Sequence, residues 1–282
     1  MLCIYHNDLD GKCAAAIVNY KYPDCKMLEM DYKNDYNLEE IAKEDKIFIL
    51  DFALQPLNQM LKLWEINKNV VWIDHHKSNI DFCTINTIVN NINGIREIGK
   101  SGCELTWEYL FPERKIPLTV KLLGRYDVYD FTDDRTLPFQ YGMRLLDTKP
   151  NSEEWKVHFH KYIDLTVEKY IEYIQSIVDE GNIVLKYISE EDELYCKQYA
   201  FPMTFEGYNC VVLNRGLSNV KVFDSRSKDY QIMIAYVFDG RKYAVSLYTI
   251  DTTIDVSAIA KKYKGGGHKS AAGFVTEKLP WG

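Results

Sequence analysis

Three short apolar runs in the first quarter of the chain end abruptly in polar side chains. The runs are Leu2–Tyr5, Ile47–Leu50 and Val70–Ile73. Four apolar residues in a row suit a buried parallel strand and are too short for a buried helix. We therefore interpret each run as a strand and expect Val70–Ile73 to be a central one.

The stretches between these runs have helical character. Cys13–Tyr20 is rich in good helix formers, and Leu54–Asn67 has apolar residues at helical spacing. A further strand at Met27–Met30 and a short helix at Glu39–Glu44 complete the pattern. Strands that alternate with helices predict an α/β domain with a doubly wound, mostly parallel sheet.

Two more helices are predicted after the third run. Ser101 to Glu104 has the spacing of a capping box, so a helix should run from Gly102 to Leu110. Leu118–Gly124 forms the second helical segment, and the chain then carries Asp127 and Asp130 among aromatic residues. Either acid could be a ligand or a solvated turn residue.

A long segment with helical periodicity follows, from about residue 152 to residue 191. His158 and His160 lie within it, and residues two apart point to different faces of a helix, so both are interpreted as surface histidines. Gly181 is interpreted as a kink or a helix end. This segment predicts a helical connector to a second domain.

In the last part of the chain, the pattern of apolar and polar residues is typical of strands. Tyr208–Asn214, Tyr230–Phe238 and Tyr243–Tyr248 are predicted strands, and Asp239-Gly240 predicts a hairpin between the last two. Asp255 is the predicted N-cap of a helix through Tyr263. The domain organisation that follows is an α/β domain at 1–150, a helical connector at 151–200 and a smaller α+β domain at 201–282.

Composition narrows the class of protein. The 282 residues are 46% hydrophobic and carry a net charge of −7, which argues against a protein that wraps long nucleic acid. The seven scattered cysteines predict reduced, buried thiols rather than disulfides or a zinc ribbon. No signal peptide or membrane span is evident, so we expect a cytoplasmic protein.

Side chains that bind metals or transfer protons follow all three predicted strands. His6, Asp8 and Asp10 precede Gly11, Asp51 follows the second run, and Asp74, His75 and His76 follow the third; these residues share a position at a strand end. Taken alone, Asp74 could equally be the cap of the helix that follows. Because ligands bind at the carboxyl ends of parallel strands, the coincidence of all three clusters instead predicts one shared site.

Near its end the chain has Gly265, Gly266, Gly267 and His268 in succession. Consecutive glycines are usual in flexible loops, but they also let a backbone come close to a phosphate. This stretch is therefore a candidate substrate contact.

These motifs together resemble the DHH/DHHA1 phosphoesterases. They are His6-x-Asp8-x-Asp10-Gly11, Asp51, Asp74-His75-His76, Asp127 and the Gly-Gly-Gly-His268 stretch. Within that family, which includes the RecJ-type exonucleases, the sequence is most similar to the short-oligonucleotide phosphodiesterases, or nano-RNases. The resemblance implies a DHH catalytic domain and a C-terminal DHHA1 domain that binds the substrate.

The resemblance also implies two divalent ions, manganese first, with magnesium or cobalt as alternatives. His6, Asp8 and Asp51 would hold one ion, and Asp10, Asp51, His75 and Asp127 the other, so that Asp51 bridges them. Two such ions stabilise both the attacking and the leaving oxygen at phosphorus.

The remaining site residues take supporting and substrate-binding roles in this hypothesis. Asp74 would orient a histidine, and His76 would face the substrate phosphate. Gly265, Gly266, Gly267, His268 and Ser101 would contact the substrate. Family members often carry an arginine where this chain has Tyr248, so Arg215 supplies the charge instead, or Tyr248 stacks on a base.

The resulting functional hypothesis is a manganese-dependent phosphodiesterase that cleaves short oligonucleotides, either nanoRNA or linear dinucleotides, to mononucleotides. A phosphatase acting on a nucleotide 3',5'-bisphosphate, a cyclic dinucleotide, pyrophosphate or a short polyphosphate is the alternative enzyme. A nucleotide sensor without turnover is the non-enzyme alternative, and the complete ligand set argues against it. Long nucleic acid and membranes are not expected partners.

Overall fold

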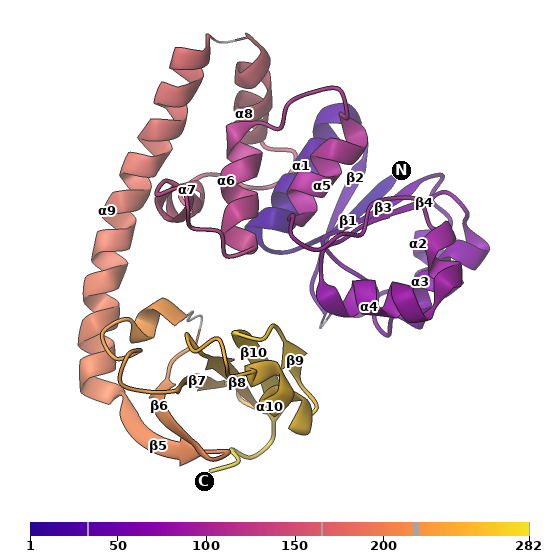
Figure 1. Ribbon diagram of the computed structural model, residues 1–282. Coiled ribbons are helices and arrows are strands. Elements are labelled where there is room, and N and C mark those ends of the chain that lie inside the picture. The colour runs from indigo at the N-terminus through magenta and orange to yellow at the C-terminus, as the bar shows by residue number, and fades with distance from the viewer. Residues whose placement is uncertain (33, 165, 217–219, 282) are drawn as a thin grey trace. The chain divides into compact units, whose positions relative to one another are not determined.

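The computed structural model describes residues 1–32, 34–164, 166–216 and 220–281, with backbone alone at 160–164. The chain divides into two compact units, Met1–Val184 and Leu185–Gly282 (Figure 1). The division falls inside the helix α9 (Val167–Tyr199). The functional boundaries predicted at residues 150 and 200 remain a prediction.

The first unit is built on a four-stranded parallel sheet with the order β2-β1-β3-β4. Its strands are β1 (Leu2–His6), β2 (Lys26–Met30), β3 (Ile47–Leu50) and β4 (Val70–Ile73). All four were predicted, but β4 is the last strand of this sheet and not a central one. Isolated bridges from Val71 to Asn93 and from Asp74 to Arg96 cover its outer edge, which explains why an edge strand is as apolar as an interior one.

In β1, β3 and β4, alternate residues are buried on opposite faces of this sheet, as strand geometry requires, whereas β2 is mostly exposed. The face that carries Phe48 and Leu50 packs against α1 (Leu9–Lys21) and α5 (Gly102–Leu110). The face that carries Ile47 and Ile49 packs against α2, α3 and α4 (Figure 1). Their bounds are Leu38–Ala42, Asn58–Ile66 and Lys77–Ile85, and a 3-10 helix follows at Thr87–Asn91. The prediction of a doubly wound α/β domain is confirmed.

Helices α6 (Leu118–Asp127), α7 (Thr136–Met143), α8 (Glu153–Asp164) and α9 extend the core on the α1 face. The capping box at Ser101 is present, and α5 has the predicted bounds. The helix predicted from Leu54 begins only at Asn58, while α6 extends three residues past Gly124 and so ends at Asp127.

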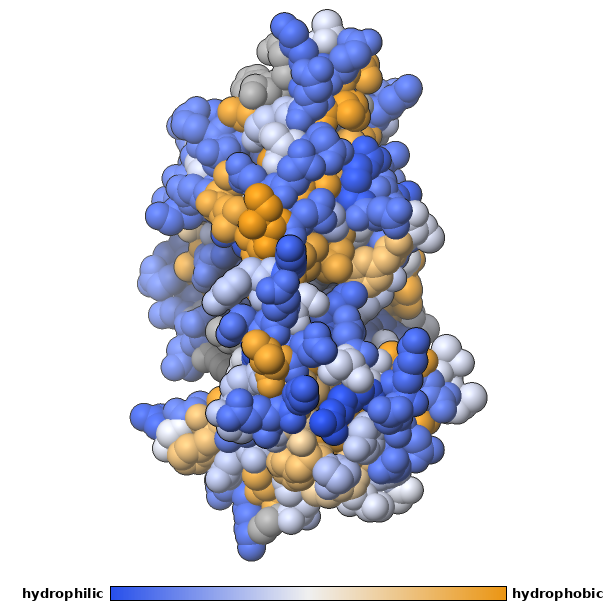
Figure 2. All heavy atoms as spheres, turned by 90° about the vertical axis from the view of Figure 1, so that its left-hand side faces the viewer, coloured by the Kyte–Doolittle hydropathy of each residue, from blue (hydrophilic) through white to orange (hydrophobic). Residues whose placement is uncertain are grey.

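Helix α9 runs through Gly181, so this glycine does not end the helix. A Cβ atom at Gly181 would lie 1.7 Å from the Pro138 carbonyl oxygen of α7, and one at Gly142 would lie 2.1 Å from the Ile177 oxygen. The glycines therefore allow α7 and α9 to pack with their backbones in contact. Exposed apolar side chains, including Val167, Ile183 and Leu194, also occur along α9, and Figure 2 shows apolar patches among hydrophilic ones on the side where α9 lies in Figure 1.

The interpretation of His158 as a surface residue is also wrong. Its side chain is fully buried, and its Nδ1 atom lies 2.9 Å from the Thr119 hydroxyl. Tyr173 approaches the other ring nitrogen at 3.5 Å. These polar partners come from two other helices, and no local sequence spacing reveals them. The side chain of His160 lies outside the described part of the structure.

The second unit contains a six-stranded mixed sheet with the order β5-β6-β7-β8-β10-β9. The strands are β5 (Phe201–Phe205), β6 (Tyr208–Asn214), β7 (Ile232–Phe238), β8 (Tyr243–Tyr248), β9 (Gly266–Gly267) and β10 (Ala271–Thr276). A 3-10 helix (Val220–Phe223) and α10 (Val256–Lys262), which Asp255 caps, complete the unit. The α+β composition, the hairpin at Asp239-Gly240 and the helix cap are confirmed, whereas β5, β9 and β10 were not predicted.

Two further expectations concern the whole chain. All seven cysteines are described, and each is buried and free of a disulfide, as predicted. Among the helices of the described residues, none combines the length and apolar character needed to cross a bilayer.

Candidate metal centre

The turn from β1 into α1 supplies the first cluster of polar side chains. His6 is the last residue of β1, and Asp8 caps α1 by accepting a hydrogen bond from the Gly11 amide at 2.9 Å. The His6 Nδ1 atom lies 2.8 Å from Asp8 Oδ2. A Cβ atom at Gly11 would lie 2.3 Å from the His6 carbonyl oxygen, so only glycine allows this tight turn.

The N-terminus of α5 holds Asp10 in place. Asp10 accepts hydrogen bonds from the amides of Gly102 and Cys103 at 2.7 and 2.9 Å. Unpaired amides at a helix N-terminus favour a negative charge. Burial and the nearby Asp127 nevertheless raise the pKa of Asp10 to about 6.

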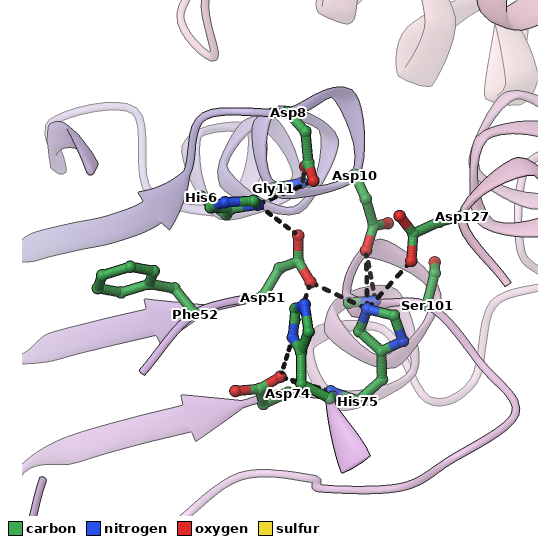
Figure 3. A network of polar contacts seen from close by, with 12 residues as sticks. His6, Asp8, Asp10, Gly11, Asp51, Phe52, Asp74, His75, Ser101 and Asp127 are labelled. Atoms are coloured by element: carbon green, nitrogen blue, oxygen red, sulfur yellow. Dashed lines mark hydrogen bonds and ion pairs between the residues drawn. The ribbon is translucent and has the colours of Figure 1, made fainter. Parts of the chain in front are cut away.

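Asp51 lies directly after β3 at the middle of the site (Figure 3). Its backbone is in the left-handed region, with φ of 51°, which costs energy for a residue other than glycine. Its side chain is 1% exposed, and neither carboxylate oxygen has a hydrogen-bond partner among the described residues. Burial and the charges of Asp10 and Asp8 raise the pKa of Asp51 well above its usual range.

Three carboxylates converge on the imidazole of His75, as Figure 3 shows. The His75 Nε2 atom lies 3.1 Å from both Asp51 Oδ1 and Asp127 Oδ2, and 3.9 Å from Asp10 Oδ2. Burial opposes protonation of this imidazole, but the acids outweigh it and raise the pKa of His75 to about 12. In a site without other cations, a proton on His75 offsets part of the repulsion between the acids.

Asp74 is fully buried and contacts the ring of His76. Its Oδ1 atom lies 2.8 Å from His76 Nδ1 and accepts the backbone amides of His75 and His76, while Asn79 donates to Oδ2 at 2.6 Å. Burial alone would raise the pKa of Asp74, but these hydrogen bonds lower it. Asp74 does not cap α4, whose N-cap is His76. The predicted support of a histidine therefore concerns His76.

The described side chains form three groups in which one ligand atom of each member lies within 4.8 Å of the others. The groups are His6, Asp8 and Asp51; Asp10, His75 and Asp127; and Asp51, His75 and His76. Carboxylate and imidazole donors suit manganese and similar divalent ions. Buried oxygens of Asp51 without a partner are the feature expected of a ligand to such ions, so the residues present fit a metal centre.

A cavity of about 410 Å³ adjoins these groups. Asp8, Asp10 and Asp127 form one part of its lining. Further polar residues of the lining are Asn7, Lys12, Tyr126, Gln140, Arg144 and Thr148. Apart from the tyrosine beside Asp127, sequence reasoning gave no weight to them, because nothing in the local pattern shows that α7 faces the β1–α1 turn.

Two acids and one serine near the site have distinct surroundings. Asp127 reaches His75, whereas Asp130 is solvent-accessible and pairs with Arg125 at 3.5 Å. The buried hydroxyl of Ser101 accepts the Glu104 amide at 3.4 Å. Its predicted contact with the substrate stays a prediction.

In the second unit, the glycine stretch is part of a hairpin rather than a free loop. Gly266 and Gly267 pair with Gly273 and Ala272 of β10, and Gly267 has φ of 137°. His268 is exposed in the turn between the two strands. A Cβ atom at Gly265 would lie 2.1 Å from the Gly273 oxygen, so packing within the hairpin also requires this glycine.

Arg215 and Tyr248 are both engaged within the second unit. Arg215 pairs with Asp192 at 2.5 Å, and its guanidinium lies 4.8 Å from the centre of the Tyr195 ring. Tyr248 is half-buried at the end of β8 and packs against the cluster around Phe223. Their predicted roles in substrate binding stay predictions.

Comparisons with known proteins agree with this arrangement. Residues 1–124 match the DHH family, N-terminal domain. Oligoribonuclease NrnB of Bacillus subtilis is 26% identical over 97% of this chain and 72% of its own length. Protein R106 of Acanthamoeba polyphaga mimivirus is 22% identical over 88% of this chain. The match covers only 57% of the length of that relative. The pGpG-specific phosphodiesterase PggH of Vibrio cholerae has a similar fold, with a TM-score of 0.53, 12% identity, and coverage of 98% of this chain and 93% of its own.

The matched residues 1–124 contain the whole parallel sheet and, apart from Asp127, all the carboxylate and imidazole donors of the three groups.

Proposed function

We propose that this protein is a manganese-dependent phosphodiesterase that cleaves short oligonucleotides, such as nanoRNA or linear dinucleotides, to mononucleotides. The observation that carries the proposal is the buried Asp51 carboxylate, whose two oxygens have no hydrogen-bond partner among the described residues and face two groups of donors. The oligonucleotide activities in the names of NrnB and PggH support the choice of substrate.

The ligands in this proposal are His6, Asp8 and Asp51 for one ion and Asp10, Asp51, His75 and Asp127 for the other. Asp51 Oδ2 lies 3.8 Å from His6 Nδ1, and its Oδ1 lies 3.1 Å from His75 Nε2, so each oxygen faces one set. Two bound divalent ions would polarise the phosphodiester and lower the pKa of a water nucleophile. His75 would hold an ion only as the neutral imidazole, so it would release its proton when the site is filled.

His76 is the proposed contact to the leaving oxygen. Its Nδ1–H donates to the Asp74 carboxylate, which fixes the ring and leaves Nε2 for the substrate. The buried Asp74 accepts five hydrogen bonds, which keep it ionised and fix the orientation of the His76 ring. A proton moved from Nε2 to the leaving oxygen would complete the displacement.

The second unit supplies most of the remaining substrate contacts in this proposal, and Ser101 of the first unit supplies one. His268 lies at the tip of the β9–β10 hairpin, where the exposed glycines keep side chains away from an approaching phosphate. Ser101, Arg215 and Tyr248 complete the proposed set.

The test is a comparison of initial rates with manganese on a panel of substrates: dinucleotides, longer oligomers, cyclic dinucleotides, a nucleotide 3',5'-bisphosphate and pyrophosphate. The dinucleotides should be cleaved fastest, and His268→Ala should raise KM for them more than it lowers kcat. Asp239→Asn, in the exposed turn between β7 and β8, is the matched control within the second unit. A rate on pyrophosphate that exceeds the dinucleotide rate by orders of magnitude would contradict the proposal.

A further inference from the structure

The cavity beside the metal centre contains two cationic side chains for which the proposed reaction at the scissile phosphate has no use. Lys12 of α1 and Arg144, the C-cap of α7, line it together with Gln140 of α7. All of them belong to the first unit, as do the acids of the metal centre on the other part of the lining.

Arg144 is held in place without being neutralised. Its guanidinium lies 4.6 Å from the centre of the Tyr141 ring and beside the Tyr126 hydroxyl. Within the described parts of the chain it forms no ion pair, in contrast to Arg215, which pairs with Asp192. An arginine stacked on a ring keeps its planar set of donors available for an anion.

Gln140 is the second observation that indicates a ligand. Its side chain is 5% exposed, and its Oε1 atom is buried without a hydrogen-bond partner among the residues described. A buried amide that lacks a partner is costly, and such groups usually acquire one from water or from a bound molecule. Gln140 lines the cavity, so a ligand that enters the cavity can supply that partner.

Lys12 adds a positive charge at the β1–α1 end of the cavity. Its only ion pair among the described residues is a 3.5 Å contact to Glu29, whose side chain is about half exposed. Exposed pairs of this kind contribute roughly 0 to 1 kcal/mol, so Lys12 can turn to a stronger anion at little cost.

We propose that this cavity binds a second phosphate of the substrate, the one next along the chain from the phosphate that is cleaved. Arg144 and Lys12 supply the charge, and the Gln140 Oε1 atom accepts a hydrogen bond from the adjoining sugar hydroxyl. The assignment rests on the proposed function for the position of the cleaved phosphate. Away from the acids, the lining contains the donors Arg144, Lys12 and Tyr126, which suit a phosphate better than a base edge with mixed donors and acceptors.

The first experiment compares kcat/KM for three dinucleotides that differ only in a terminal phosphate: ApA, pApA and ApAp. The intact protein should prefer one of the phosphorylated forms to ApA by roughly tenfold to hundredfold, the value of one charge-assisted hydrogen bond. Arg144→Gln should reduce this ratio towards one, and Arg144→Lys should restore part of it. Arg114→Gln, an exposed arginine of the same unit outside the cavity, is the matched control and should leave the ratio unchanged.

Two results would overturn the assignment: equal rates of the intact protein on all three dinucleotides, or an unchanged ratio in Arg144→Gln. If Arg144→Gln keeps the phosphate ratio but loses discrimination between pGpG and pApA, the cavity binds a base instead. In both cases cleavage of the dinucleotides would still support the proposed function.

A binding measurement separates the two proposals. Calorimetry with calcium in place of manganese compares adenosine 3',5'-bisphosphate with adenosine 5'-monophosphate. The bisphosphate should bind about tenfold more tightly, and Arg144→Gln should remove the difference. This result would support the second phosphate site even if no dinucleotide were cleaved. In that case only the proposed function would fail. Equal affinities for the two nucleotides would overturn the second phosphate site.

Discussion

The Nε2 atom of His75 and the Oδ1 atom of Asp51 lie 3.1 Å apart, yet neither forms a properly aligned hydrogen bond within the described structure. Both side chains are nearly buried, at 9% and 1% exposure. Without a bound ion, only opposite charges hold this pair together, and they require a proton on His75. The two atoms are well placed to share a third partner, and a divalent ion satisfies both.

Replacing Asp51 with Asn should remove the centre of the metal site while keeping its shape. We expect weaker binding of both manganese ions and a loss of at least about 100-fold in kcat, because changes to residues that merely support a ligand already cost roughly 10- to 100-fold. Calorimetry and a dinucleotide assay measure the two effects. Asp130→Asn, at the exposed ion pair with Arg125, is the matched control, and retention of both ions by Asp51→Asn would refute the bridging role.

The same variant should be more stable than the parent protein when no metal is present. Asp51 is buried beside Asp8 and Asp10, and their charges oppose its ionisation. An amide at this position removes that repulsion, so the melting temperature in a chelator should rise. A lower melting temperature would mean that the Asp51 carboxylate stabilises the fold, contrary to this account.

The two adjacent histidines should respond differently to alanine. His75→Ala should lose one ion, because Nε2 faces Asp51 and Asp127. His76→Ala should retain two ions and lose most activity, since its Nδ1 is engaged with Asp74. Metal stoichiometry from mass spectrometry of the native protein distinguishes them. His76 Nδ1 also lies 3.8 Å from Asp51 Oδ1, so loss of an ion in His76→Ala would make this residue a ligand.

Replacing Gly102 with Ala should damage the site through packing alone. The new Cβ atom would lie 2.6 Å from the Asp51 Cβ atom and 3.0 Å from Asp10 Oδ2, so α5 must move away from the acid that its amides hold. We expect a loss of about 1 to 3 kcal/mol in the free energy of unfolding, together with weaker metal binding. Gly266→Ala, where nothing lies within 4 Å of the new atom, is the control for stability.

The metal-free protein should lose stability as the pH rises from 5 to 8. The pKa of Asp10 is raised to about 6 in the folded chain, so folding favours its protonated form and stability falls as the pH approaches 6. The pKa of His75 is raised to about 12, so its contribution is complete below the ordinary histidine value of about 6.5 and declines above it. Asp10 and His75 therefore both lower the stability of the metal-free protein as the pH rises.

Manganese should reverse this trend, because bound ions require deprotonated ligands. Melting temperatures measured across this pH range with a chelator and with manganese test both statements. The rise in melting temperature on adding manganese should be larger at pH 8 than at pH 5.5. An equal rise at both values would contradict the assignment of Asp10 and His75 as ligands.

Features that depend on neighbouring residues in the sequence were predicted well. The capping box placed α5 at Gly102–Leu110, and Asp239-Gly240 marked the β7–β8 hairpin. Features that depend on residues far away in the sequence were not predicted. His158 is buried because Thr119 and Tyr173 satisfy its ring, and the two-residue β9 exists because β10 lies beside it.

By itself the sequence determined the four strands of the first sheet and the placement of acids and histidines directly after three of them. Apolar runs and the turns that end them are local, and parallel strands bring their carboxyl ends to one edge. The resemblance already favoured Asp127 over Asp130, and the structure brings Asp127 to His75. Only the tertiary structure decided that α5 amides hold Asp10, and that Gln140 and Arg144 line the adjoining cavity. Those contacts depend on how helices far apart in the chain pack, and packing is set by the shapes of whole surfaces rather than by spacing along the sequence.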